Sequence, residues 1–360
     1  MYQLIKMKVI RYKHCRENWE WLAVNKIDIN WIDLQDTNLV VGKNASGKSI
    51  TSRILDNFKN IFLPGNIAYY GEYFIDLIDY NNIKYIYYIK WENGLVKQET
   101  LHVHGELKIN RTEQGTKIYS NTKNEFIEVS PPANKPVIQV RRDKKEHPYF
   151  EELATWAEGI DLIPFADAHP VELSFGNKNK IDDALDYLSN NELEKEKIIF
   201  ELNSIGYNVR VIDIVKNFDK YILFIEEEGI TYRIKHFELS QGMFRSLLIL
   251  MYLHYLIVKQ KASLIIIDDL CEGLDYDRAS SLGKLIFNKM KANNVQFIAT
   301  SNDYFLMNSV SINDWNIISR RDNKIISHNY QNSKKLSDEF KFTGMNNFQL
   351  FASDYLENPY

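Results

Sequence analysis

The chain has 360 residues, of which 45% are apolar and 26% are charged, as is typical of a globular protein with a sizeable core. A formal net charge of −4 gives no overall basic field that would point to nucleic acid, although a local basic face stays open. Two cysteines, Cys15 and Cys271, cannot build a disulfide framework. The first residues lack a signal-peptide pattern, and the longest apolar stretch, 247–258, is too short to cross a bilayer. We therefore expect a cytoplasmic protein that binds no membrane.

The first 120 residues are rich in predicted β-strands, interrupted by one loop and one helix. Two alternating segments and a short apolar run precede the loop, and apolar residues recur at helical spacing after it. Asn93-Gly94 lies between two β-branched and aromatic runs, which is a strong hairpin signal. The strands expected here cover residues 3–12, 25–33 and 37–41, and a β-rich stretch runs from 69 to about 120.

A proline-rich connector at 131–136 leads to a second part in which helices and strands alternate. No heptad pattern is sustained along the chain, which argues against long coiled-coil arms. Helices are expected near 149–156, 181–189, 192–205 and 241–258, and strands near 137–140, 209–215, 221–226, 230–237, 264–268 and 296–301.

The loop at 42–49 matches the GxxxxGK[ST] phosphate-binding pattern in full. Backbone N–H groups of such a loop wrap a triphosphate, so side chains must be absent at Gly42 and Gly47. Lys48 would reach the β- and γ-phosphates, and the Ser49 hydroxyl would bind Mg²⁺. The strand before the loop and the helix after it place the anion at a helix N-terminus. The nucleotide-binding residues predicted in this loop are Gly42, Lys43, Asn44, Ala45, Ser46, Gly47, Lys48 and Ser49.

A second feature is the apolar strand expected at 264–268, which ends in two carboxylates. A buried strand of an α/β sheet presents its C-terminal residues at the edge where ligands bind. We therefore expect Asp268 to hold Mg²⁺ opposite Ser49, and Asp269 to orient or deprotonate the attacking water. The cofactors expected from both features are ATP and Mg²⁺.

The order of these motifs resembles that of the ATP-binding-cassette (ABC) ATPases. Residues 239–243 resemble their signature motif, and Leu274-Asp275 follows the paired acids as their D-loop does. In that family the signature of one protomer closes on the nucleotide held by the other, so the resemblance implies a homodimer that clamps two ATP molecules. It implies nucleotide contacts for Ser240, Gly242 and Asp275. The resemblance also makes Gln139, in the strand expected at 137–140, a candidate to sense the metal, the nucleotide and the attacking water.

Two positions depart from the ABC pattern. Asp269 stands where most members have a glutamate, and Asn302 stands where they have the switch histidine. Asparagine can donate a hydrogen bond to a γ-phosphate but carries no charge near neutral pH. We therefore predict that Asp269 and Asn302 act as catalytic residues in a slow hydrolysis, with ATP binding more decisive than turnover. The adenine-stacking residue is left open among Tyr12, Trp19 and Trp21.

The phosphate loop and the signature lie about 190 residues apart, which is wide for a transport cassette. The layout resembles the soluble RecF/SMC/OLD-like superfamily, and within it the stand-alone ATPases of bacterial defence or toxin–antitoxin operons. That resemblance implies an α/β fold: an ABC-type P-loop ATPase head with a mixed β-sheet lobe and an inserted helical–β subdomain, without a coiled coil or a Toprim domain. The parts expected are lobe I at 1–140, the inserted subdomain at 141–237, lobe II at 238–330 and a C-terminal tail at 331–360.

We predict an ATPase that dimerises on ATP and acts as a switch for a separately encoded effector, a nuclease or toxin, in anti-phage defence or toxin control. A RecF-like repair ATPase that binds DNA is one alternative, and an ATP-gated scaffold without catalysis is another. An apolar stretch at 342–351 is suited to dock on the body or on a partner. DNA contact would depend on a basic cluster beside Gln139, formed by Lys135, Arg141, Arg142, Lys144 and Lys145.

Overall fold

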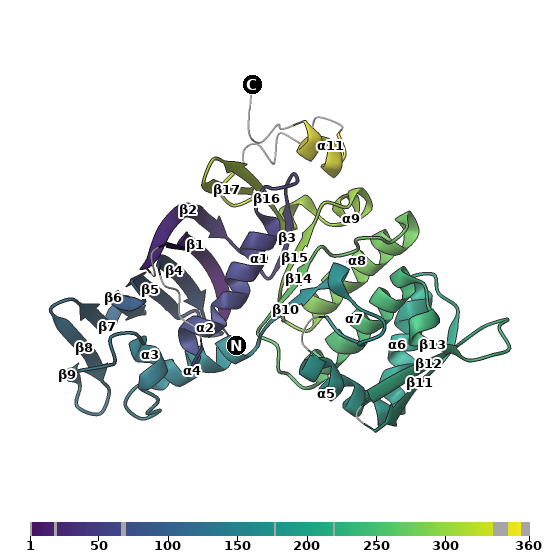
Figure 1. The fold of residues 1–360 in the computed structure, drawn as a ribbon, viewed down its shortest axis with the longest axis horizontal. Helices are drawn as coiled ribbons and strands as arrows, with labels where there is room; N and C mark the ends of the chain where they lie inside the picture. Colours follow the sequence, from purple (N-terminus) through teal and green to yellow (C-terminus); the bar gives the residue numbers. More distant parts are fainter. Residues whose placement is uncertain are drawn as a thin grey trace.

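The computed structural model describes residues 2–17, 20–65, 70–175, 178–218, 220–333 and 345–353. Within them the chain forms a mixed α/β structure with a 14-stranded sheet and a separate three-stranded sheet (Figure 1). One end of the large sheet is a parallel core. Its strands are, in spatial order, β10 (Ile160–Pro164), β14 (Leu264–Asp268), β15 (Gln296–Ser301), β3 (Thr37–Val41) and β16 (Trp315–Arg321).

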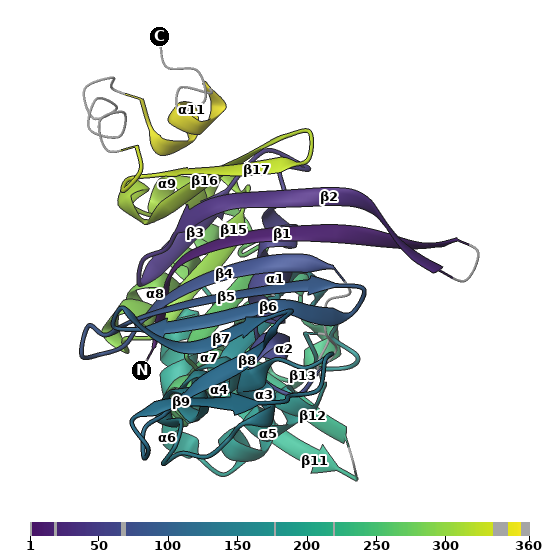
Figure 2. The ribbon, with the colours of Figure 1, turned by 90° about the vertical axis from the view of Figure 1, so that its left-hand side faces the viewer.

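The same sheet continues from β16 into a long, mostly antiparallel extension, whose strands lie side by side in Figure 2. The hairpin expected at Asn93-Gly94 is confirmed, because both residues have positive φ (53° and 70°) and their strands pair there. The extension contains, in spatial order, β17 (Lys324–Asn329), β2 (Glu20–Asp33), β1 (Gln3–Glu17), β4 (Gly71–Ile78), β5 (Lys84–Glu92), β6 (Leu95–Val103), β7 (Glu106–Thr112), β8 (Gly115–Ser120) and β9 (Glu125–Val129).

Helices cover both faces of the parallel core, which is why the side chains of its central strands β14, β15 and β3 are largely buried on both faces. Side chains of β14 alternate between two hydrophobic clusters: Ile266 faces one and Ile267 the other. The first cluster includes side chains from α1 (Lys48–Asn57), α2 (Lys59–Phe62) and α4 (Pro148–Glu158). The second includes side chains from α7 (Gln241–Val258) and α8 (Tyr276–Ala292).

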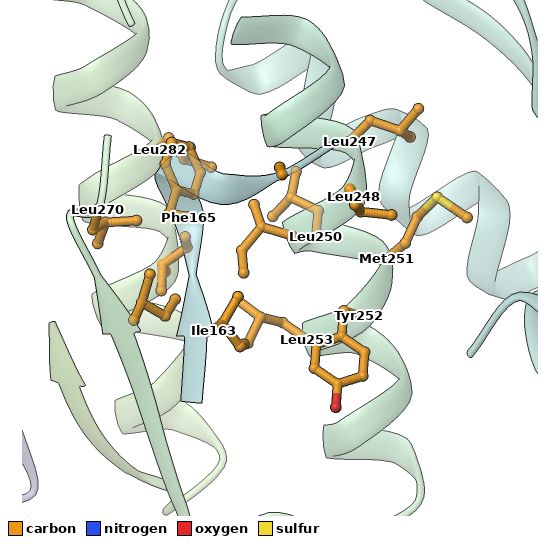
Figure 3. Packing of buried hydrophobic residues seen from close by; sticks show 14 of the residues in the cluster. Ile163, Phe165, Leu247, Leu248, Leu250, Met251, Tyr252, Leu253, Leu270 and Leu282 are labelled. Carbon is orange, nitrogen blue, oxygen red and sulfur yellow. The ribbon is translucent and has the colours of Figure 1, made fainter. Parts of the chain in front are cut away.

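The segment between β10 and α7 forms a helical–β subdomain that packs on α7. Figure 3 shows α7 side chains such as Leu250 and Leu253 facing Ile163 of β10. By length and composition α7 could cross a membrane, but 78% of it is buried inside the fold, as befits a core helix. The elements of the segment are η1 (Phe165–Asp167), α5 (Lys178–Ser189), α6 (Glu192–Ser204), β11 (Val209–Asn217), β12 (Lys220–Glu227), β13 (Ile234–Lys235) and η2 (His236–Glu238).

Two local expectations are wrong. The strand expected at 230–237 is limited to the two residues of β13, because the 3₁₀ helix η2 begins directly after it. The strand expected around Gln139 is a short helix, α3 (Val137–Val140), that begins after Pro136. The buried Glu99 carboxylate accepts a hydrogen bond from the Val137 N–H at 2.8 Å, so a tertiary contact satisfies this helix end. The division into four parts stays a prediction.

The C-terminal segment packs against the body at α9 (Tyr304–Ser309), which precedes η3 (Ile312–Asp314) and β16. Within α11 (Asn347–Ala352), the ring of Phe348 lies 4.7 Å from that of Tyr304. Asn347 donates to the Val310 carbonyl at 2.9 Å. The docking expected for 342–351 is therefore seen in its second half, while residues 342–344 lie outside the described part of the chain.

Candidate nucleotide-binding site

The phosphate loop joins the C-terminus of β3 to the N-terminus of α1, and its backbone requires glycine at two places. Gly47 has φ +107°, and a Cβ there would lie 2.4 Å from the Ile325 side chain. A Cβ at Gly42 would lie 2.7 Å from the Ile318 carbonyl oxygen. Ala45 also has a positive φ, of 64°. The loop is thus wrapped tightly between α1 and the strands β16 and β17.

Lys48, the first residue of α1, points back into the loop. Its Nζ donates a hydrogen bond to the Gly42 carbonyl at 2.8 Å, and the side chain is buried. Burial lowers the pKa of Lys48, whereas the nearby carboxylates of Asp269 and Asp268 act in the opposite direction. The two carboxylates thus favour the charged form of the Lys48 ammonium group.

Asp268 brings three elements together at the C-terminal edge of the core. Its Oδ1 accepts hydrogen bonds from Ser52 of α1 at 3.0 Å and from Thr300 of β15 at 2.5 Å. The Thr300 hydroxyl in turn accepts from the backbone N–H of Asp269 at 2.9 Å. Thr300 thus fixes both acids relative to the phosphate-loop helix.

Asp269 directly follows β14 and adopts φ +54°, a left-handed conformation that turns the chain out of the strand. Its side chain lines the cleft beside the phosphate loop. Burial raises the pKa of Asp269, and the charges of Asp268 and Glu272 raise it further. A carboxylate with a raised pKa is a better acceptor for a proton from water than a freely solvated aspartate.

The phosphate loop and Asp269 line a cleft of about 630 Å³, whereas Asp268 is not among the described residues that line it. Asn302, which follows β15, reaches this cleft, and its amide donates to the Asn44 side chain at 3.2 Å. The structure therefore brings the predicted catalytic pair to the phosphate loop. The lining residues are Asn44, Ala45, Ser46, Gly47, Lys48, Ser49, Ile50, Asp269, Glu272, Asn302 and Arg320.

Two charged residues of the cleft, Glu272 and Arg320, were not predicted. Arg320 lies near the end of β16, and its Nε donates to the Asp322 carbonyl at 2.8 Å. It reaches the cleft because β16 pairs with β3 directly before the phosphate loop. The sequence signal that could have indicated it is the Arg320-Arg321 pair before Asp322-Asn323, but only the strand pairing shows which loop it faces.

Gln139 is held away from the residues that line this cleft. It is buried, and its Nε2 donates to the carbonyls of Asn60 at 2.8 Å and Ile61 at 3.0 Å. Its role as metal sensor stays a prediction. Among the aromatic candidates, Tyr12 packs edge-on against Tyr70, and Trp19 lies outside the described residues.

The signature and D-loop residues are not among the described residues that line the cleft. Ser240 caps α7 by accepting from the Met243 N–H at 3.3 Å. A Cβ at Gly242 would lie 2.9 Å from a methyl carbon of Leu274, so the two segments are in close contact. Asp275 caps α8.

The oxygen donors of Ser49, which lines the cleft, and of Asp268, which directly precedes Asp269, suit a hard divalent cation. A serine hydroxyl at Ser49 and a carboxylate at Asp268 are oxygen ligands of the kind that Mg²⁺ takes alongside phosphate oxygens and water. In the described part of the chain, no group of three or more His, Cys, Asp or Glu side chains is arranged to hold a metal. Because these two residues supply only two ligands, a Mg²⁺ ion held by Ser49 and Asp268 would complete its coordination with phosphate oxygens and water.

Comparison with known proteins shows the family and the fold of the chain. Residues 38–308 match the family described as "AAA domain, putative AbiEii toxin, Type IV TA system". The search of curated proteins found no match. Among solved structures, an Smc head bound to the C-winged helix domain of ScpA is similar with a TM-score of 0.53 and 14% identity, over 91% of this chain and 98% of that one.

A second similar structure is an Smc head domain with an extended coiled coil, bound to the C-terminal domain of ScpA from Pyrococcus furiosus. Its TM-score is 0.50 at 12% identity, over 95% of this chain and 100% of that one. At such identities the likeness shows the fold alone, whereas the family match spans most of the chain. The chain therefore belongs to this AbiEii-type AAA family and has the ABC-type P-loop ATPase fold of the RecF/SMC-like superfamily.

Proposed function

We propose that this chain binds ATP with Mg²⁺ in the cleft around Lys48, hydrolyses it slowly, and uses ATP-driven dimerisation as a molecular switch. The observation that carries the proposal is the composition of the cleft. The phosphate loop, Asp269 and Asn302 line it, whereas Ser240 and Gly242 are not among the described residues that do so. A second copy could supply the missing half.

The residues of the cleft have distinct roles in this proposal. Lys48 exchanges its bond to the Gly42 carbonyl for the β- and γ-phosphates, and Arg320 adds a second positive charge. Ser49 and Asp268 hold Mg²⁺, which neutralises charge on the phosphates when bound. Asp269 orients the attacking water and accepts its proton.

Slow turnover follows from the two polar groups nearest the reaction. Asp269 is one methylene shorter than a glutamate, so it reaches less far toward a water in line with the γ-phosphate. Asn302 donates a hydrogen bond but brings no charge. Both features favour a long-lived ATP-bound state.

The signature residues suit a role in trans. Ser240 offers a hydroxyl at the N-terminus of α7, an 18-residue helix whose dipole favours an anion there. Such a helix end stabilises a γ-phosphate only when it reaches it, and the cleft of the same protomer is lined by other residues. ATP would therefore join two subunits.

The proposed task of the switch is to control a separately encoded effector in bacterial defence or toxin control. Its support is indirect: the matching family is described by its toxin–antitoxin context, and the similar Smc heads are bound to domains of ScpA. An ATP-dependent change of subunit contacts is suited to such control, because it changes a partner-binding surface at the same time.

Mixing two inactive variants tests the composite site. Lys48→Ala removes the phosphate contact in cis, and Ser240→Arg blocks the contact in trans. Each alone is expected to lose ATPase activity, because both sites of its homodimer are defective. Mixed in equal amounts, the two form heterodimers with one intact site, so about a quarter of the wild-type rate of phosphate release should return. Removal of Mg²⁺ with EDTA should abolish it.

A matched control is the mixture of Lys48→Ala with Asp269→Asn. Both changes affect residues that act in cis, so each heterodimer has two defective sites and no activity should return. Equal recovery in both mixtures, or none in the first although sedimentation detects heterodimers, would contradict the proposal.

A further inference from the structure

One turn of the helical–β subdomain touches the segment that we propose to act in trans. Gly206 and Tyr207 connect α6 to β11, and the guanidinium carbon of Arg278 in α8 lies 4.5 Å from the centre of the Tyr207 ring. Arg278 Nη2 also donates to the Gly206 carbonyl at 3.3 Å. Its Nη1 pairs with the Asp275 carboxylate at 2.6 Å. Arg278 thus joins the turn to the D-loop.

Tyr207 also reaches the first turns of the signature helix α7. Its hydroxyl lies 3.4 Å from the Ser246 hydroxyl, and the side chain is only 7% exposed. A Cβ placed on Gly242 would be 3.7 Å from the same Tyr207 oxygen. The ring is therefore enclosed between the signature helix and the start of α8.

On its other side the D-loop is held by Arg245 of α7. Arg245 is buried, and its Nη1 donates to the Glu272 carbonyl at 2.7 Å. Its Nη2 donates to the Ala166 carbonyl at 2.6 Å. The signature helix and the D-loop thus form one packed unit, and Tyr207 attaches the helical–β subdomain to it.

Capping of α8 does not explain the contact with the subdomain. The Asp275 carboxylate satisfies the Arg278 backbone N–H at 3.1 Å, which needs no side chain at position 278. The guanidinium instead lies on an aromatic ring from another part of the chain, while the paired Asp275 side chain is 52% exposed. This arrangement leaves the Asp275 side chain accessible at the surface.

We propose that Tyr207 and Arg278 are positioning residues for the trans half of the ATP site, a proposal that rests on the proposed function. They hold Ser240 and Asp275 in the arrangement that closes on the partner's nucleotide. The same contact involves the turn between α6 and β11. A movement of the D-loop on closure of the dimer is therefore transmitted directly to the helical–β subdomain.

The test measures dimerisation in Mg²⁺-ATP by sedimentation, in an Asp269→Asn background that prevents hydrolysis. Tyr207→Ala and Arg278→Ala should each weaken the dimer by about tenfold or more, whereas ATP affinity at concentrations that keep the chain monomeric stays unchanged. Tyr207→Phe, which keeps the ring under Arg278, should stay within about threefold of the parent.

Arg210→Ala is the matched control. Arg210 is an arginine of the same subdomain, paired with Glu226 at 3.1 Å and 62% exposed, without a contact to the D-loop among those described. In the Asp269→Asn background, the dimer dissociation constant of Arg210→Ala should equal that of the parent, Asp269→Asn alone. Hydrogen exchange of the nucleotide-free chain gives a second measurement that needs no dimer: amides 270–278 should exchange faster in Tyr207→Ala than in Arg210→Ala.

Weaker dimers with intact ATP affinity and faster exchange at 270–278 would support the inference. Unchanged dimer dissociation constants for both alanine variants would overturn the inference. A loss of ATP affinity in the monomer as large as the loss of dimer affinity would overturn it as well. Should the parent itself stay monomeric in saturating ATP, the proposed dimer switch fails. The exchange measurement still decides the positioning role in that case, since unchanged protection at 270–278 rejects it.

Discussion

At the scale of single residues, the backbone conformation of Asp269 determines where its carboxylate lies. Asp269 directly follows β14 with φ +54°, and its backbone N–H donates a hydrogen bond to the Thr300 hydroxyl. An extended residue at this position would continue the strand and carry its carboxylate along the sheet edge. The left-handed turn instead presents the carboxylate to the cleft opposite the phosphate loop.

Asp269→Asn is expected to lower the rate of ATP hydrolysis by about 10²–10⁴-fold, because an amide cannot accept the proton of the attacking water. ATP binding should persist, since Lys48 and the loop are untouched, so ATP-bound dimers should accumulate. Phosphate release and size-exclusion chromatography measure the two effects. Asp277→Asn, at an exposed position in the first turn of α8, should behave as wild type. An unchanged hydrolysis rate in Asp269→Asn would rule out its assignment as base.

At the scale of elements, α3 shows how a four-residue helix depends on tertiary contacts. Glu99 is fully buried and accepts from the Val137 N–H and from the Tyr87 hydroxyl, at 2.8 and 2.9 Å. Arg111 lies 3.8 Å from the same carboxylate and donates to the Lys135 carbonyl at 2.7 Å. Burial raises the pKa of Glu99, although these partners act in the opposite direction. Glu99 thus joins β6 to α3 directly and, through Arg111, to the proline-rich connector.

Glu99→Ala is expected to lower the free energy of unfolding by about 3 kcal/mol or more, because it leaves a helix N–H without its acceptor and Arg111 without its charge partner. Urea unfolding measures the change. Glu128→Ala serves as a control, since its carboxylate is 83% exposed and its partner Lys117 is 3.6 Å away, so its effect should stay within about 0.5 kcal/mol. A similarly small effect at Glu99 would show that the buried cluster does not hold the connector.

At the scale of the whole molecule, charge does not favour the DNA-binding alternative. The net charge is −4, and within the predicted basic cluster Arg142 pairs with Glu151 at 3.0 Å. Four exposed members, Lys135, Arg141, Lys144 and Lys145, remain. This is a small number of cations compared with the 6–10 phosphate contacts that give steep salt dependence.

The switch proposal predicts weak DNA binding that does not increase when ATP closes the dimer. Fluorescence anisotropy with short duplex and single-stranded DNA, across a salt series with and without ATP, measures it. Replacing Lys144 and Lys145 by glutamine should change little. An ATP-dependent rise in affinity that falls steeply with salt, and that is lost in this double variant, would instead favour a RecF-like repair ATPase.

The sequence by itself determined the elements whose signals are local. A loop of fixed glycine and lysine spacing, an apolar strand ending in acids, and an Asn-Gly turn depend on neighbouring residues, so the pattern at 42–49 and the hairpin at Asn93-Gly94 could be recognised without a fold. Only the tertiary structure decided what distant segments do together. Arg320 reaches the cleft because β16 pairs with β3. The helix α3 forms where Glu99 accepts a hydrogen bond from its first N–H. Tyr207 contacts Arg278, which lies 71 positions further along the chain. Such contacts depend on packing between segments that no local spacing encodes.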